Sequence, residues 1–194
     1  MAYTPKILAF AGSTRKESFN KKLVKIAAEA ARSVGAQVTY LDLKDLPMPL
    51  YDGDLETEQG IPENARKLKA LMMAHDGFLI SAPEYNSSIS GVFKNAIDWS
   101  SRPSAGEAPL VCFAGKVVSL MSASPGALGG LRGLAVVRSL LSNIRVIVLP
   151  DQVAVPKAHE AFDPDGKLKD TKQQAGIEAL GRDLAGVLVK LKGS

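Results

Sequence analysis

The residues best suited to do chemistry lie in one short polar stretch, Gly12–Asn20. It follows an apolar run at residues 7–11, which is typical of a buried strand, and it precedes a helical pattern that begins near Phe19. Backbone N–H groups and the macrodipole at a helix start favour an anion. Side chains that can donate hydrogen bonds to a phosphate there are Ser13, Arg15, Ser18 and Asn20. The spacing predicts a phosphate-binding turn. The alternative is that Ser18 only caps the helix.

This turn carries no means of cleaving a phosphate. It lacks the second glycine and the Lys-Ser/Thr pair of a nucleoside-triphosphate loop, and Thr14 and Ser18 stand where a dinucleotide fingerprint has glycines. It also contains no cysteine, so the thiolate of a phosphatase loop is missing. A phosphorylated cofactor held by its phosphate is therefore favoured, and a phosphate-ester enzyme is a weaker alternative.

Composition narrows the class of protein. The 194 residues suit one domain spanning 1–194, and a net charge of +4 spread along the chain disfavours nucleic-acid binding. The single Cys112 excludes an intrachain disulfide and favours a reducing compartment. No apolar run reaches the roughly 20 residues needed to cross a bilayer, and the first residues lack the pattern of a secretion signal. We expect a soluble cytoplasmic protein with neither nucleic acid nor membrane as partner.

Apolar strands alternate with amphipathic helices along the chain. Predicted strands cover residues 7–11, 38–41, 77–82, 116–122 and 145–150, the last closed by Pro150. Predicted helices cover 19–34, a segment from Pro62, 92–101, a segment ending near Asn143, and a final helix through Leu191. Residues 42–60 should form a long loop, 102–115 a surface connection, and a polar segment should run through Asp170. This alternation predicts an α/β fold with a parallel sheet covered by helices on both faces, and it leaves the strand order open.

Three of the connecting loops should share one edge of the sheet. In parallel α/β sheets, ligands bind beyond the carboxyl ends of the strands. The loops that follow the first, third and fourth strands are polar and marked by glycine or proline, at residues 12–20, 83–91 and 123–130. We expect these three loops to form the binding site.

The three loops also carry sequence motifs that occur together in a known family. They read Gly12-Ser-Thr-Arg-Lys-Glu-Ser-Phe-Asn20, then Pro83-Glu-Tyr-Asn86 followed by Lys94-Asn-Ala-Ile-Asp-Trp99, and then Ser124-Pro-Gly-Ala-Leu-Gly-Gly130. In order and spacing this set resembles the NADPH-dependent FMN reductase family, from about Ile7 through the final helix. Within that family the chain is most similar to bacterial flavin-dependent quinone and chromate reductases, with azoreductases as near relatives.

The resemblance implies a flavodoxin-like three-layer sandwich with a five-stranded parallel sheet in the order 2-1-3-4-5 and FMN beside strands one and three. The residues that match the family's FMN phosphate and ribityl loop are Ser13, Arg15, Ser18, Phe19 and Asn20. Those that match the loop beside the isoalloxazine are Pro83, Glu84, Tyr85 and Asn86, and Ser87 in the same loop is also expected to bind the cofactor. The residues that match the loop at the ring's pyrimidine edge are Ser124 and Gly126. Two positions depart from the family's pattern. Ser87 stands where many relatives have a second aromatic residue, and Ser90 stands where many have proline.

The same resemblance implies a function. Hydride would pass from NADPH or NADH through bound FMN to quinones or similar acceptors such as azo compounds, nitro compounds, chromate or free flavin. No catalytic side chain is expected, because the cofactor carries the chemistry. Relatives act as dimers or tetramers, so a homodimer or homotetramer is implied. The alternative is an FMN-binding electron carrier, although such carriers are usually acidic and the pI here is about 9.1.

Several residues keep more than one interpretation. Glu84 could face the ligand, cap the next helix or pair with a neighbouring subunit, and Gly129-Gly130 could serve the ligand or close packing. His75 and His159 have no partners at metal-ligand spacing, so no metal site is expected. Cys112 should be an inert, partly buried thiol. Residues expected to serve structure or a subunit contact are Asn95, Asp98 and Trp99.

Overall fold

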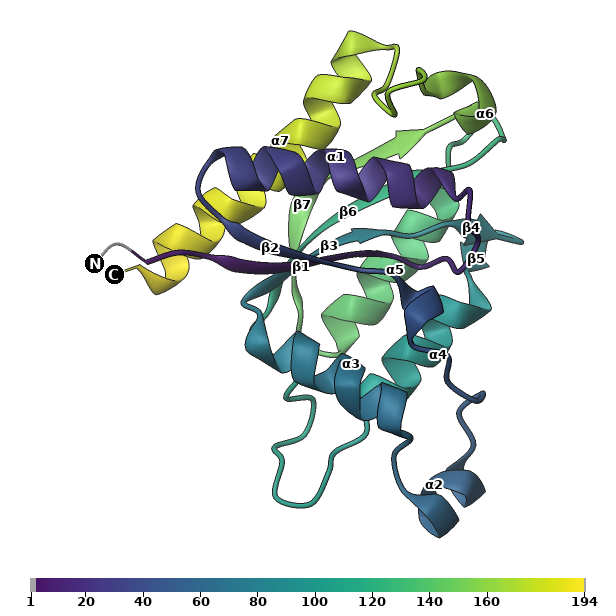
Figure 1. Ribbon diagram of the computed structural model, residues 1–194, viewed down its shortest axis with the longest axis vertical. Coiled ribbons are helices and arrows are strands. Elements are labelled where there is room, and N and C mark those ends of the chain that lie inside the picture. The colour runs from purple at the N-terminus through teal and green to yellow at the C-terminus, as the bar shows by residue number, and fades with distance from the viewer. Residues whose placement is uncertain (1–2, 194) are drawn as a thin grey trace.

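The computed structural model describes residues 3–193 and contains a five-stranded parallel sheet between two helical layers (Figure 1). Its strands are β1 (Lys6–Ala11), β2 (Gln37–Leu41), β3 (Gly77–Ser81), β6 (Val117–Ala123) and β7 (Ile147–Val155). They lie in the order β2-β1-β3-β6-β7. Counted along the main strands this is 2-1-3-4-5, so the predicted flavodoxin-like order is confirmed, and the choice that the alternation left open is settled.

Helices cover both faces of this sheet (Figure 1). One face carries α1 (Phe19–Ser33) and α7 (Thr171–Lys192), and the other carries α3 (Glu63–Ala74), α4 (Gly91–Ser100) and α5 (Leu131–Asn143). Successive strand side chains point to opposite faces. Ile7 and Ala9 therefore join the α1–α7 core, while Leu8 and Phe10 join the core under α3, α4 and α5. Because both faces are covered, the strands read as nearly continuous apolar runs.

Helix α1 begins at the predicted residue and ends one residue earlier than predicted. The spacing of apolar residues within 19–34 predicts that Val34 lies on the buried face and Lys21 on the charged, solvent-facing side. Val34 is instead half exposed, because the helix has ended and the chain turns at Gly35 in the left-handed region. Lys21 is buried. Its Nζ lies 2.6 Å from Oδ2 of Asp42, so the charge is paired beside the end of β2.

The fifth strand is longer than predicted, because it passes through Pro150 instead of ending there. The register of the β6–β7 pair shifts between Val148 and Gln152, which places the proline in a bulge. Arg138 Nη2 donates to the carbonyl oxygens of Leu149 at 2.9 Å and of Pro150 at 3.1 Å. Since β7 is an edge strand, a residue without an N–H costs little there. The prediction that Pro150 closes the strand is wrong.

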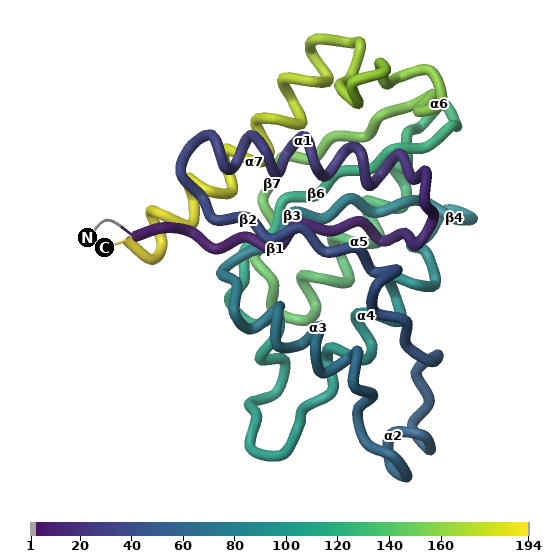
Figure 2. Tube along the Cα trace, in the orientation of Figure 1, coloured from purple at the N-terminus to yellow at the C-terminus, as the bar shows by residue number. Residues whose placement is uncertain are grey.

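The segment predicted as one long loop, residues 42–60, contains two short helices, η1 (Leu43–Asp45) and α2 (Gly53–Gln59). Each begins at an aspartate whose side chain accepts a backbone hydrogen bond, Asp42 from Lys44 and Asp52 from Asp54. Such caps compensate for the short helix length. Figure 2 shows α2 at the end of an excursion away from the sheet.

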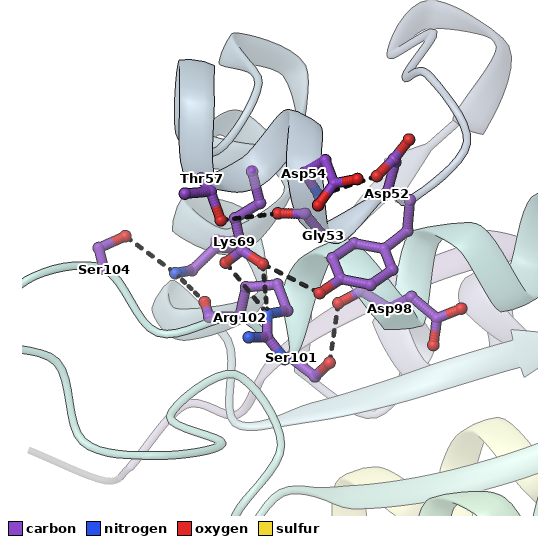
Figure 3. Close-up of polar contacts among 11 residues, drawn as sticks. Asp52, Gly53, Asp54, Thr57, Lys69, Asp98, Ser101, Arg102 and Ser104 are labelled. Atoms are coloured by element: carbon purple, nitrogen blue, oxygen red, sulfur yellow. Dashed lines mark hydrogen bonds and ion pairs between the residues drawn. The ribbon is translucent and has the colours of Figure 1, made fainter.

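Side chains of α4 and the turn after it hold this excursion in place. Trp99 Nε1 donates to the carbonyl of Pro49 at 2.8 Å, and Asn95 Oδ1 accepts from the Tyr51 N–H at 2.8 Å. Arg102 Nε reaches the carboxylate oxygens of Glu56 at 2.9 and 3.1 Å (Figure 3). Asn95 and Trp99 therefore serve structure, which is one of the two roles expected for them.

A buried lysine anchors the connection predicted at residues 102–115. The last part of this connection is itself buried in the core. Lys69 Nζ donates to the Arg102 carbonyl at 2.6 Å and to Ser104 Oγ at 3.0 Å (Figure 3). It also donates to a carboxylate oxygen of Glu107 at 2.5 Å. The polar segment after β7 contains a further short helix, α6 (Ala158–Ala161). Across residues 3–193, no helix combines the length and apolar character that crossing a membrane requires.

Candidate functional site

The three predicted loops meet at the carboxyl ends of β1, β3 and β6, where one buried side chain joins them. Asn20 Oδ1 accepts from the Ser81 hydroxyl at 2.8 Å and from the Ala123 N–H at 3.0 Å, and its Nδ2 donates to the Ala123 carbonyl at 2.8 Å. Asn20 thus ties the start of α1 to the ends of β3 and β6. Most of the hydrogen-bonding capacity of its amide is used to hold the loops in position, a role that residue type alone did not indicate.

The first loop offers hydrogen-bond donors at the start of α1. Ser13 and Ser18 are buried, whereas Arg15 is exposed. Ser18 occupies the N-cap position, but its side chain makes no capping hydrogen bond, so its hydroxyl is not used as a simple cap. Within residues 3–193, the N–H groups of residues 13, 14, 16, 17 and 18 meet no protein acceptor, and only the Arg15 N–H reaches Ser13 Oγ, at 3.3 Å. Free donors at a helix start fit an anion.

Phe19, the first residue of α1, is half-buried beside the first loop. Its ring stacks on that of Phe162, with centroids 6.1 Å apart and planes 5° from parallel. Lys22 Nζ lies 5.8 Å from the centroid of the Phe162 ring. The aromatic pair therefore links the start of α1 to the segment after α6.

The second loop, within which no strands were predicted, folds into a hairpin of β4 (Glu84–Tyr85) and β5 (Ser88–Ile89). Its two turn residues, Asn86 and Ser87, have φ values of 50° and 64°. A two-residue turn with both residues in the left-handed region matches the right-handed twist of paired strands. Pro83 before the hairpin is buried, and Tyr85 is half exposed at its tip. Strands of two residues are too short to show periodicity in a sequence.

Glu84 anchors this hairpin to the start of α5. Its Oε1 accepts from Arg132 Nε at 3.0 Å and Nη2 at 2.7 Å, and its Oε2 accepts from the Gly133 N–H at 2.9 Å. Burial would raise the pKa of this carboxyl, but the bonds from Gly133 and Arg132 outweigh burial and lower the pKa below its ordinary value. Of the roles left open for Glu84, the structure shows capping, and the capped helix is α5 instead of the next helix, α4.

Arg132 and Gly133 were missed as partners of the hairpin because they lie far along the chain from Glu84. One signal was available, since the first turn of α5 contains no acidic residue of its own. The positive end of a helix dipole favours a carboxylate. An acid from a loop at the same sheet edge is a natural source, and Glu84 supplies it.

The third loop is held at Gly126 by the side chain of Ser124 and by the backbone of Lys157, in the segment after β7. Gly126 donates its N–H to Ser124 Oγ at 3.2 Å, and its carbonyl accepts from the Lys157 N–H at 3.2 Å. Ser124 is partly buried, while Gly126 is exposed, and a Cβ on Gly126 would meet Ser124 Oγ at an ordinary contact distance of 3.6 Å. Both predicted residues of this loop therefore lie on the side that faces away from the core.

The glycine pair that ends the third loop is closely packed, as one of the two alternatives for it expects. A Cβ on Gly129 would lie 2.6 Å from the backbone of Val155, and one on Gly130 would lie 2.0 Å from Ser122 Oγ. Both glycines have positive φ, 62° and 95°. Ser122 Oγ is buried beneath Gly130 with no hydrogen-bond partner among the described residues.

Other candidate residues take structural positions. His75 Nδ1 lies 2.6 Å from the carbonyl oxygen of Leu71, and its Nε2 lies 2.8 Å from Thr39 Oγ1. Residues 3–193 hold no group of three or more His, Cys, Asp or Glu arranged to bind a metal. Cys112 is fully buried, not partly buried as predicted, and burial raises the pKa of its thiol to about 11.

A parallel sheet in this order, with polar loops gathered at its carboxyl edge, defines a flavodoxin-like protein. The sequence model of the NADPH-dependent FMN reductases matches residues 5–160, and the chain belongs to that family. It is 34% identical to an NAD(P)H:quinone oxidoreductase of Solanum tuberosum, over 97% of this chain and 95% of that protein. It is 37% identical to a quinone reductase of Escherichia coli (strain K12), over 74% of this chain and 72% of that protein.

A solved structure gives the same assignment. The flavoenzyme NAD(P)H:(acceptor) oxidoreductase FerB from Paracoccus denitrificans superposes with a TM-score of 0.80 at 28% identity, over 98% of this chain and 100% of that chain. An azoreductase from Bacillus anthracis has a TM-score of 0.60 at 18% identity and supports the fold alone. The resemblance read from the three loop motifs is confirmed.

Proposed function

We propose that this chain is an FMN-dependent NAD(P)H oxidoreductase that reduces quinones or similar small acceptors, among them azo compounds, nitro compounds, chromate and free flavin. One observation carries the proposal. The three loops whose motifs match the family are brought to one sheet edge, where Asn20 bonds directly to Ser81 and Ala123. NADPH is the favoured donor because the matching family is NADPH-dependent, with NADH as the second candidate.

The residues of the site suit a flavin with a phosphorylated tail. Free N–H groups at the start of α1, with Ser13, Arg15 and Ser18, offer the donors that a phosphate requires. Tyr85 on the hairpin is half exposed and Gly126 is exposed, so both are free to contact the flat ring of a flavin. FMN bound there would supply two-electron hydride chemistry. The protein's task is to hold and orient, so no acid, base or nucleophile is assigned.

Steady-state kinetics test this proposal. Purified protein reconstituted with FMN should oxidise NADPH in the presence of a benzoquinone, with ping-pong kinetics. A matched reaction without quinone measures background oxidation by oxygen. Protein that binds FMN but consumes neither NADPH nor NADH would instead support the electron-carrier alternative. Protein that binds no FMN would refute the assignment.

Three further features belong to the same proposal. We place residues 1–194 in one flavodoxin-like domain, because α7, which lies beyond the family match, packs along α1 in the same core. A homodimer or homotetramer is inferred from the family, and light scattering after size exclusion tests it. A cytoplasmic location is inferred from the free, buried thiol of Cys112.

A further inference from the structure

Ser90 joins two of the three loops through one buried hydroxyl. It lies between the hairpin and α4, at the N-cap position of that helix, and is 1% exposed. Its Oγ donates to the carbonyl oxygen of Gly12 at 2.6 Å and accepts from the Phe93 N–H at 3.3 Å. The same hydroxyl thus caps α4 and holds the first residue of the phosphate-binding turn. A proline, which many relatives have at this position, can make neither bond.

Gly12 is held at its N–H, at its carbonyl and by the packing of α4 against it. Its N–H donates to the Ser81 carbonyl at 2.9 Å, and its own carbonyl is held by Ser90. A Cβ at this position would lie 2.8 Å from Phe93 Cβ, so α4 packs directly on the glycine. The backbone just before the free donors of the first loop therefore has little freedom to rotate.

Fixing the carbonyl of Gly12 also sets the direction of the next N–H. A trans peptide is planar, so its C=O and N–H point in opposite directions. With the Gly12 oxygen bound to Ser90, the Ser13 N–H points away from Ser90 and α4. Within residues 3–193 this N–H meets no acceptor. If the peptide turned over, a carbonyl oxygen would take the place of the donor and would repel an anion.

We propose that Ser90 is a positioning residue that keeps the Ser13 N–H directed toward the flavin phosphate, and so makes the site prefer FMN over riboflavin. This inference rests on the proposed function. Ser90 itself does not contact the phosphate. It acts through the peptide between Gly12 and Ser13, and its effect should therefore depend on whether the ligand carries a phosphate.

Flavin binding to the apo protein tests this role without reference to turnover. Quenching of flavin fluorescence gives Kd for FMN and for riboflavin, which differ only in the phosphate. In Ser90→Ala, Kd for FMN should rise about ten-fold, as expected when a charge-assisted hydrogen bond is lost. Kd for riboflavin should change less than about two-fold. Ser90→Thr, which keeps the hydroxyl, should restore most of the FMN affinity.

The chain offers a matched control on the same helix. Ser100 is also buried, and its Oγ donates to the Ala96 carbonyl at 2.6 Å, but it lies at the far end of α4 from Gly12. Ser100→Ala should leave both Kd values near wild type, and melting temperatures of all variants show whether they fold. If Ser90→Ala weakens both flavins equally, or neither, the positioning role is overturned. Wild-type protein that binds neither flavin would refute the proposed function itself.

Discussion

Glu84 and Arg132 form a two-point contact across 48 residues of sequence, with Oε1 of the carboxylate 3.0 Å from Nε and 2.7 Å from Nη2. The Glu84 side chain is 8% exposed, whereas that of Arg132 is 59% exposed. The other carboxylate oxygen binds the Gly133 N–H. The hairpin that carries Tyr85 is thus attached to the start of α5 by a mostly buried charge. Without that charge the bonds from Arg132 and Gly133 lose their charge assistance, and a side chain with one acceptor oxygen in place of two can serve only one of these two partners.

Glu84→Gln should lower the free energy of unfolding by about 1–3 kcal/mol, because the negative charge is lost and one of the two acceptor oxygens is replaced by an NH2 group that cannot accept. Urea titration measures the change. The matched control is Asp98→Asn, which breaks the more exposed Lys94–Asp98 pair on α4 and should cost less than about 0.5 kcal/mol. Equal effects in the two variants would show that the anchoring of the hairpin does not matter for stability.

The same carboxylate should make stability depend on pH. The pKa of Glu84 is lowered in the folded protein from its ordinary 4.5, because hydrogen bonds from Gly133 and Arg132 outweigh burial. A lowered folded pKa means that ionised Glu84 stabilises the fold above pH 4.5, and this stabilisation is lost as the pH falls through the folded pKa. Urea midpoints from pH 7 to pH 3 should therefore fall less steeply for Glu84→Gln than for wild type. Parallel curves would contradict this account.

Cys112 should be unreactive in the folded protein. Burial raises the pKa of its thiol to about 11, so little thiolate exists at neutral pH, and the side chain is fully buried. Ellman's reagent at pH 7.5 should react with native protein at least about 100-fold more slowly than with protein in guanidinium chloride. One thiol per chain should react once the protein is unfolded. Rapid reaction of the native form would indicate local opening near Phe113.

Asn20→Ala should destabilise the protein more than a substitution that removes a single side-chain hydrogen bond. Three buried hydrogen bonds are lost, and the Ala123 N–H is left without an acceptor, which together cost about 2–4 kcal/mol. The control is Asn64→Ala, where one bond to the Pro47 carbonyl is lost and about 0.5–1 kcal/mol is expected. Unfolding in urea compares them, and a loss no greater than that of the control would contradict the bracing role.

Much of the sheet could be predicted because its strands are covered on both faces. Runs such as Ile7–Ala11 and Gly77–Ser81 are apolar at nearly every position and end at polar, glycine- or proline-marked loops, which marks both the strands and the edge where a ligand binds. Strand order followed from the loop motifs and not from the strands. The end of β7 was misplaced because proline normally closes a strand, whereas Arg138 here supports a bulge around it.

The candidate site was predictable only to the level of loops. Residue types in the first loop indicated an anion, but they did not show that Asn20 would serve as a brace. The partners of Glu84 and Ser90 lie 48 and 78 residues away along the chain, and contacts between such distant residues cannot be inferred from the local sequence pattern. They depend on which loop ends the topology brings together, so only the three-dimensional structure shows them.

Arg15→Ala and Ser18→Ala should weaken retention of FMN and leave turnover with saturating FMN within about two-fold of wild type. The proposed binding mode puts the phosphate of FMN at these residues, in the loop before α1, and the reactive ring beside the hairpin. Loss of a guanidinium from a phosphate should raise Kd about 10- to 100-fold, and the salt dependence of binding should fall with it. Lys16→Ala, a neighbouring exposed cation, is the control and should change Kd less than about two-fold. A ten-fold loss of kcat in Arg15→Ala with the site fully occupied would show that the first loop acts on the ring as well as on the phosphate.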